Sequence, residues 1–292
     1  MYYIVYGILK LFSFLPMFIL YGISDFLSFL VYHVFGYRRS EVLKNLQIAF
    51  PEKSFEERKK IARKFYGNFI DTFVETIKLL NTSDKGLSKL YQGNVVLLND
   101  LAKRHPNIQL HAIHNFNWEI VHLGVARELT VPFLGVYMPI KNPALEKIFK
   151  GIRTRYGTIL VPATEFKSSF SKYEKDNYIL ALVADQSPAS PRNAYWVNFF
   201  GKPTAFVTGP EKAARLRNVA VVFANFYKVK RGVYTIETRL ITENAASMKE
   251  GELTIEYVRY VEECIRKRPD NYLWSHRRWK HEYRDEYAGH VL

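Results

Sequence analysis

Apolar and polar positions follow two alternating patterns along most of the chain. Short apolar runs of strand length occupy 108–113, 131–137 and 178–184, and stretches with helical periodicity occupy 117–129, 143–156, 209–217 and 250–268. The runs 219–227 and 233–241 flank Arg231-Gly232 and predict a β-hairpin. Strands that alternate with helices indicate an α/β domain with a mixed central sheet flanked by helices.

A long amphipathic helix is predicted upstream of this pattern, over residues 54–80. Ser54 is a suitable N-cap, and Glu57 follows three residues later. This spacing is typical of a capping box, in which the two side chains bind each other's backbone N–H groups.

The N-terminal segment is almost free of charge. Residues 2–36 carry only Lys10 and Asp25, which leaves uncharged runs at 11–24 and 26–37. A membrane-spanning helix needs about 20 mainly apolar residues, so the two runs together are long enough and neither is alone. Asp25 leaves three arrangements open, namely a spanning helix, a hairpin and a helix at the membrane interface. No small-residue cleavage site follows the apolar stretch, which disfavours a signal peptide.

Basic residues crowd the chain directly after this segment, at positions 38, 39, 44, 53, 58, 59 and 60. By the positive-inside rule they place the rest of the chain on the cytoplasmic side. We therefore expect a membrane-anchoring segment over 1–37 and a single domain over 38–292.

Composition narrows the function only slightly. The formal net charge of +14 attracts nucleic acid, anionic lipid headgroups or an acidic protein, and does not choose among them. Cys264 is the only cysteine, which excludes an internal disulfide and a cysteine-rich zinc site. It falls within the predicted helix 250–268, where we expect a small core residue.

The segment 111–119 (HAIHNFNWE) offers the most specific chemistry. His114 ends a predicted strand, and Glu119 lies in the first turn of the next helix. The break between them lets the carboxylate fold back onto the imidazole, as in a general base whose ring is oriented by an acid. A structural hydrogen-bonded histidine has the same spacing. A metal site is disfavoured because two histidines on one helix face are missing and His111 should point to the opposite side of the strand from His114.

Two other segments carry polar groups in informative places. Asp185 and Gln186 follow the predicted strand 178–184, where side chains at the carboxyl end of a sheet usually line a site, although a turn before Pro188 is also consistent. Basic and aromatic residues alternate over 266–280. In a soluble protein this pattern would suggest single-stranded nucleic acid, and beside a membrane segment it favours an interfacial anchor or a headgroup contact.

Several ordered blocks resemble one family. The block His114-Asn-Phe-Asn-Trp-Glu119 resembles the His-x4-acidic motif of the lysophospholipid acyltransferase superfamily, and specifically its lipid A biosynthesis acyltransferase branch (the lauroyl and myristoyl transferases). Further similar blocks lie at 40–52, 137–143, 153–157, 183–188, 199–203, 208–209 and 269–280. The likeness covers nearly the whole chain.

The resemblance implies a membrane-bound O-acyltransferase of the bacterial inner membrane, with its catalytic domain on the cytoplasmic face. It implies that His114 is the base, that Glu119 orients it, and that Arg153, with Arg155 close behind, binds the acceptor's phosphate or the developing oxyanion. Asp185 and Gln186 are expected to bind substrate. The acceptor would be a hydroxyl of a lipid A precursor or related glycolipid, without metal, organic cofactor or nucleic acid. Acyl carrier protein is the favoured thioester donor, since a positive surface attracts an acidic partner.

The family usually has Gly where this chain has Phe116, and Asn115 replaces an aromatic residue. A bulky side chain there is expected to narrow the site or reshape the acceptor pocket. Two alternatives stay open. The donor can be acyl-CoA, or the acceptor an aminolipid, lysophospholipid or glycosylated phospholipid. Alternatively, the protein is a basic, membrane-anchored binder of nucleic acid or lipid with a purely structural His-Glu pair.

Overall fold

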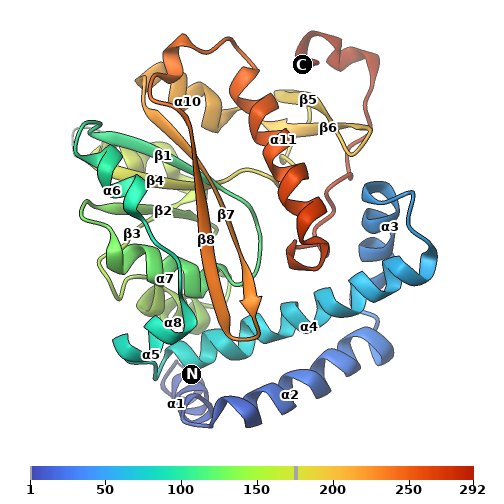
Figure 1. The fold of residues 1–292 in the computed structure, drawn as a ribbon, viewed down its shortest axis with the longest axis vertical. Helices are drawn as coiled ribbons and strands as arrows, with labels where there is room; N and C mark the ends of the chain where they lie inside the picture. Colours follow the sequence, from blue (N-terminus) through green and yellow to red (C-terminus); the bar gives the residue numbers. More distant parts are fainter. Residues whose placement is uncertain (1, 174–176) are drawn as a thin grey trace.

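The computed structural model describes residues 2–173 and 177–292, and is built around a six-stranded sheet with the order β3-β2-β4-β1-β7-β8 (Figure 1). Strands β1 to β4 and β7 are parallel where they pair, and β8 runs antiparallel to β7. The bounds are β1 (Asn107–Ala112), β2 (Phe133–Tyr137), β3 (Ile159–Pro162), β4 (Tyr178–Val183), β7 (Ala220–Lys230) and β8 (Val233–Thr242). The predicted α/β domain with a mixed central sheet is confirmed.

Helices cover both faces of the sheet, and the alternation of side chains on β7 shows how. Val222 and Ala224 join the core beneath α7 (Trp118–Glu128) and α8 (Pro143–Arg153). Phe223, between them in sequence, points the other way and packs with α11 (Glu252–Lys267). Because both faces are buried, the strand is a continuous apolar run, as is usual for parallel sheets.

The predicted helices are present with small differences at their ends. The long helix α4 (Phe55–Leu79) begins with the expected capping box, in which Ser54 and Glu57 bind each other's backbone N–H groups. Helix α10 (Gly209–Arg217) has the predicted bounds. The remaining α-helices are α3 (Arg39–Ala49), α5 (Asp84–Leu90), α6 (Val96–Ala102) and α9 (Phe166–Phe170).

The N-terminal segment forms two helices, of which the second runs alongside α4 and the first lies near the carboxyl end of α4 (Figure 1). They are α1 (Tyr2–Ser13) and α2 (Met17–Phe29), and a π-helical turn, Leu30–Val34, continues α2. The break comes at Pro16, whereas Asp25 lies within α2 and pairs with Arg231 at 2.6 Å. Proline lacks the backbone N–H that a continuous helix would need. The continuous stretch Met17–Val34 is long and apolar enough to cross a membrane by length and composition.

A second, two-stranded sheet was not predicted. It consists of β5 (Ala194–Phe199) and β6 (Lys202–Val207), joined by Phe200-Gly201. Both loop residues have positive φ, at 53° and 75°, as a two-residue type I′ hairpin requires. Strand β3 was also absent from the prediction, because its apolar run is only four residues long.

Candidate active site

His114 and Asp185 meet at the carboxyl edge of the sheet. They lie two residues beyond β1 and β4, which are neighbouring parallel strands. Asp185 Oδ1 is 2.7 Å from His114 Nδ1, and both carboxylate oxygens also accept from the backbone N–H of His114. Burial alone would raise the pKa of Asp185, but the contacts with His114 outweigh it and hold that pKa below its ordinary value. An ionised carboxylate only accepts, so Nδ1 carries the proton and Nε2 is the basic nitrogen.

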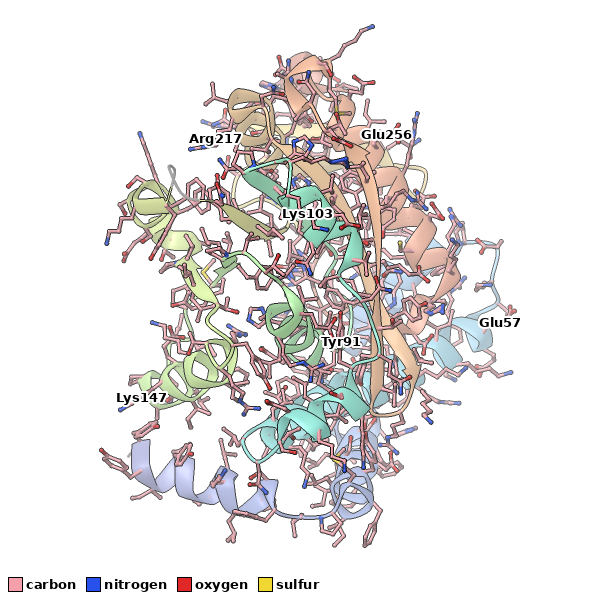
Figure 2. The ribbon with its side chains drawn as sticks, turned by 60° about the vertical axis from the view of Figure 1, so that its left-hand side comes forward. Glu57, Tyr91, Lys103, Lys147, Arg217 and Glu256 are labelled. Atoms are coloured by element: carbon pink, nitrogen blue, oxygen red, sulfur yellow. The ribbon has the colours of Figure 1, made fainter. Side chains whose placement is uncertain are left out.

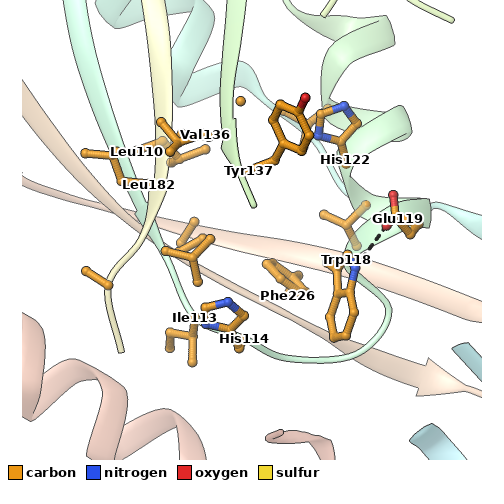
Figure 3. A pocket seen from close by; sticks show the side chains of 18 of the residues that line it. Leu110, Ile113, His114, Trp118, Glu119, His122, Val136, Tyr137, Leu182 and Phe226 are labelled. Atoms are coloured by element: carbon orange, nitrogen blue, oxygen red, sulfur yellow. Dashed lines mark hydrogen bonds between the residues drawn. The ribbon is translucent and has the colours of Figure 1, made fainter. Parts of the chain in front are cut away.

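Glu119 has a different partner from the one predicted. Its carboxylate is 2% exposed and accepts from Arg153 Nε at 3.0 and 3.2 Å, from Arg153 Nη2, and from Trp118 Nε1 at 3.1 Å. No hydrogen bond joins His114 to Glu119 within residues 2–173 and 177–292, and Figure 3 shows the two side chains apart. The predicted His114–Glu119 contact is therefore wrong. Parallel pairing brings Asp185 to His114, while α8 brings Arg153 to Glu119.

The ion pair of Glu119 and Arg153 leaves one side of the guanidinium available. Burial opposes the charge on Arg153, but the contacts with Glu119 raise its pKa above the ordinary value. In the part of the chain that the structure describes, no hydrogen bond is recorded for Nη1, while Nε and Nη2 both bind Glu119. Arginine presents its donors in a planar fork that suits an anionic oxygen.

The start of α7 is fixed by Asn117. Its side-chain oxygen accepts from the backbone N–H groups of Glu119 and Ile120, at 3.0 and 3.4 Å. Its side-chain nitrogen donates to Glu75 at 2.9 Å. This N-cap satisfies two N–H groups that have no partner within the helix and sets the position of Glu119.

A pocket of about 500 Å³ runs between α7 and the sheet, and the side chains of His114 and Glu119 lie beside it (Figure 3). His114, Glu119, Arg153 and Gln186 contribute to its wall. Most other lining residues are apolar and come from α7, the strands and the loops that follow them; they include Leu110, Val121, Val125, Phe133, Ala181, Leu182 and Ala224. Met138 and Val183, which are 66% and 39% exposed, mark the solvent side near the ends of β2 and β4.

Gly135 and His122 face each other in the middle of the pocket. Gly135 on β2 faces His122 on α7, and a Cβ on Gly135 would lie 3.5 Å from the imidazole. His122 donates from Nε2 to the carbonyl of Arg153 at 3.1 Å, and burial lowers the pKa of the ring. The neutral ring therefore supports Arg153. His122 was not predicted as a site residue, because helical periodicity does not distinguish it from the other buried positions of α7.

Arg155 and Phe116 do not belong to the pocket. Arg155 donates to the carbonyls of Leu79 and Thr82, at the carboxyl end of α4. Its predicted role in binding substrate is therefore not supported, because its guanidinium caps a helix. Phe116 is fully buried among Phe65, Phe69 and Trp118. The expectation that it narrows the site is wrong, since its ring points into the core.

The C-terminal block 269–280 supports the loop between β1 and α7, which carries His114. Its backbone accepts from Phe116 at Asn271, and the N–H of Leu273 donates to the carbonyl of His114 at 3.1 Å. Arg278 is 1% exposed and packs over Phe206, so it is not a headgroup contact at the surface. Within residues 2–173 and 177–292, no three His, Cys, Asp or Glu side chains gather as a metal site would require. Cys264 is buried, as expected, and burial raises its pKa to about 12.

Comparison with known proteins places the chain in one family. The chain is 26% identical over 280 residues to a lipid A biosynthesis lauroyltransferase from Escherichia coli (strain K12), covering 94% of this chain and 89% of that protein. It is 22% identical to a lipid A biosynthesis palmitoleoyltransferase of the same organism, covering 83% and 79%. A solved 1-acyl-sn-glycerophosphate acyltransferase from Thermotoga maritima aligns with 91% of this chain and 97% of its own, at a TM-score of 0.39 and 13% identity.

The family model described as bacterial lipid A biosynthesis acyltransferase matches residues 1–281, nearly the whole length. The ordered blocks that include His114 and Glu119 therefore belong to one continuous relationship. The chain is an acyltransferase and a member of the bacterial lipid A biosynthesis acyltransferase family.

Proposed function

We propose that the protein transfers a fatty acyl chain from an acyl thioester, with acyl carrier protein as the favoured carrier, to a hydroxyl of a lipid A precursor or related glycolipid. The observation that carries this proposal is the imidazole of His114, held by Asp185 at the rim of an apolar pocket. The family relationship supports an acceptor of the lipid A type.

His114 would act as the general base. Nε2 takes the proton of the acceptor hydroxyl while the hydroxyl oxygen attacks the thioester carbonyl. Collapse of the tetrahedral intermediate breaks the C–S bond, and the proton held by His114 passes to the departing thiolate. The buried charge of Asp185 stabilises the imidazolium that exists between these two transfers. One ester bond forms and one thioester bond breaks, without a covalent acyl-enzyme.

Arg153 would stabilise negative charge beside the base. Glu119 binds Nε and Nη2 of Arg153 and so holds the guanidinium in one orientation. The direction of Nη1 is thereby fixed, although the arginine side chain is flexible on its own. A preorganised cation at the pocket wall suits the oxyanion of the intermediate or a phosphate of the acceptor. Gln186, also on the wall, supplies an uncharged polar contact.

The apolar pocket would hold the acyl chain. Its wall follows α7 from Trp118 to Val125 and the facing strands from their carboxyl ends towards Phe133 and Leu110. A chain with its thioester carbonyl near His114 would therefore extend between α7 and the sheet. Removing that chain from water supplies binding energy in proportion to the apolar area buried.

The two N-terminal helices would place the protein on the membrane. Large side chains on α1 and α2, and in the segments that follow each of them, are more than half exposed: Tyr3, Ile4, Leu11, Phe14, Phe18, Phe26, Phe29 and Phe35. The opposite face is fixed to the domain, because Lys78 binds the carbonyls of Ser13 and Leu15. A helix that is held to the protein on one side and exposes large apolar side chains on the other is suited to lie in the interface.

A basic helix lies close to this apolar surface. In α8, Lys147 lies over the ring of Tyr2 in α1, with Nζ 4.3 Å from the ring centroid (Figure 2). Cations beside an interfacial helix are attracted to anionic headgroups. In this proposal, α1 and α2 would lie on the cytoplasmic leaflet of the bacterial inner membrane.

The test is turnover of a lipid A precursor by membranes that carry the protein, with acyl carrier protein and coenzyme A thioesters offered in parallel. We expect transfer with the acyl carrier thioester, and no transfer above background by His114→Ala. Near-full turnover by His114→Ala would exclude the proposed mechanism. Transfer only from the coenzyme A thioester, or only to a lysophospholipid or aminolipid, would replace the donor or the acceptor. Absence of thiol release from every thioester would contradict the proposal as a whole.

A further inference from the structure

A buried carboxylate on α4, Glu75, touches three separate parts of the molecule. Its side chain is 0% exposed. Oε1 accepts from the hydroxyl of Tyr21 in α2 at 3.0 Å, and Oε2 accepts from Tyr234 in β8 at 2.7 Å and from Asn117 at 2.9 Å. All three partners can donate, so the buried carboxyl oxygens of Glu75 are hydrogen-bonded, as buried polar atoms require.

The bond to Asn117 is the one that reaches the active site. An amide side chain can present its oxygen or its nitrogen to α7, and only the oxygen can cap the N–H groups of Glu119 and Ile120. Whether Glu75 is ionised or carries a proton on Oε1, its Oε2 can only accept, so it requires the nitrogen of Asn117 and directs the oxygen of Asn117 to α7. The start of α7 carries Glu119, and Glu119 holds Arg153.

We infer that Glu75 is a positioning residue for acyl transfer, which fixes the Glu119–Arg153 pair through Asn117 and connects it to the N-terminal helix through Tyr21. This inference rests on the proposed function for its kinetic test. It adds a physical path from the apolar helix α2 to the pocket. The path runs through the side chains of Tyr21, Glu75 and Asn117, then through the backbone N–H of Glu119 and the ion pair of Glu119 with Arg153.

Asp71 provides a matched control on the same helix, four residues before Glu75. It is also buried, at 2% exposure, and it binds Ser24 of α2 at 2.7 Å and Arg231 at 2.7 and 3.0 Å. Asp71 therefore connects α4 to α2 and to the β7–β8 turn, much as Glu75 connects α4 to α2 and to the start of β8. Asp71 has no recorded contact with Asn117 among the described residues, so the two carboxylates differ in their connection to α7.

The decisive comparison is kcat and KM of Glu75→Gln against Asp71→Asn, both measured on folded, purified protein. Loss of a hydrogen bond to a charged group within the active-site support is expected to lower kcat about tenfold. KM for the acyl donor should stay within about twofold, because the apolar pocket is unchanged. Asp71→Asn should keep kcat within about twofold and lower only the unfolding temperature. Equal kcat losses in the two variants would overturn the inference.

A reversed hydrogen bond offers a rescue. In Glu75→Gln/Asn117→Asp, the new amide at 75 can donate to the new carboxylate at 117, whose second oxygen still caps α7. The double variant should recover most of the lost kcat. Asn117→Asp alone places two carboxylates together, so its kcat should be lower than that of Glu75→Gln and of the double variant. Should Glu75→Gln alone not fold, the double variant is still expected to fold and turn over. A double variant that is unfolded, or as slow as Glu75→Gln, contradicts the inference.

Hydrogen exchange separates this inference from the proposed reaction. The amides of Glu119 and Ile120 should exchange faster in Glu75→Gln than in Asp71→Asn, whatever substrate the enzyme uses. If the protein transfers no acyl chain to the lipids tested but these amides respond as expected, the substrate assignment fails and the positioning role stands. If transfer occurs and the amides are unchanged by Glu75→Gln, the positioning role fails.

Discussion

Asp185 lies 71 residues after His114, which is the same offset that pairs β4 with β1. Asn107 is opposite Tyr178 and Ala112 is opposite Val183, so the register continues without interruption to His114 and Asp185. Two neighbouring parallel strands therefore place their first polar side chains beyond the sheet next to each other. The contact between the proposed base and the acid proposed to orient it is a consequence of strand pairing, and the two residues come from segments far apart in the chain.

Replacing Asp185 by Asn should preserve the shape of this site and remove its charge. The amide can present a donor to Nδ1 and so favour the wrong tautomer of His114, and the imidazolium loses its counter-charge. We expect kcat to fall by about 10²- to 10⁴-fold, by analogy with acids that orient a catalytic histidine. Measurement of kcat for Asp185→Asn beside Glu119→Gln would show which acid serves the base. A Glu119→Gln defect with normal turnover by Asp185→Asn would return that role to Glu119.

Glu119 and Asp185 show how much of the site could be predicted from the sequence. Local patterns predicted the strand before His114 and the helix behind it, and Asp185 was already expected at a strand end. The pairing of the two required the order of strands in the sheet, which local periodicity does not contain. If β1 and β4 had been known to be neighbouring parallel strands, His114 and Asp185 could have been predicted to lie close together, since each is the first polar residue after its strand. Arg155 shows the same limit. It lies two residues after Arg153, just beyond the end of α8, yet it binds the end of α4 while Arg153 binds Glu119.

Arg153 and Arg155 allow a matched test, because Arg153 is proposed to bind substrate and Arg155 caps the end of α4. Arg153→Lys keeps the charge but loses the planar fork, so it should lower kcat/KM by about tenfold or more. Arg155→Lys can still reach a carbonyl of Leu79 or Thr82, and should leave kcat/KM within about twofold. Steady-state kinetics of the two variants decide the point. Equal defects would show that Arg155 contributes to catalysis despite its place at the end of α4.

Gly135 should control the length of the acyl chain that the pocket accepts. A Cβ there meets His122 and Thr158 at ordinary van der Waals distances of 3.5 and 3.6 Å, so Gly135→Ala is sterically tolerated. Larger side chains occupy the space between β2 and α7, and Gly135→Val and Gly135→Leu should favour progressively shorter acyl chains. Mass spectrometry of the lipid product, with mixed donors in competition, measures the shift. An unchanged chain distribution in Gly135→Leu would mean that the chain lies elsewhere.

Phe116 should matter for stability and not for acceptor choice. Its ring is fully buried against Phe65, Phe69 and Trp118 and lies outside the pocket wall. Phe116→Ala leaves a cavity in this aromatic cluster and is expected to cost about 3–5 kcal/mol in the free energy of unfolding. Phe116→Leu should cost less and keep the same preference among acceptors. A change in acceptor preference at full stability would show that the ring reaches the substrate after all.

The buried carboxylate of Glu75 should make stability depend on pH near neutrality. Burial raises its pKa to about 7 from an ordinary 4.5, with Asp71 adding to the rise and hydrogen bonds from Asn117, Tyr234 and Tyr21 opposing it. Because the folded state holds this proton more tightly than the unfolded state, the contribution of the group to stability is fully present below about pH 4.5 and is lost as the pH rises through about 7.

The measurement is the unfolding temperature of the wild type and Glu75→Gln in the same detergent, from pH 5 to pH 8. Arg231, which is bound to Asp71, stays charged throughout this range. The wild type should lose roughly 3 kcal/mol relative to the variant as the pH rises, and the difference should level off above about pH 8. Parallel curves for the two proteins would show that Glu75 is ionised throughout this range, in which case its three donors outweigh its burial.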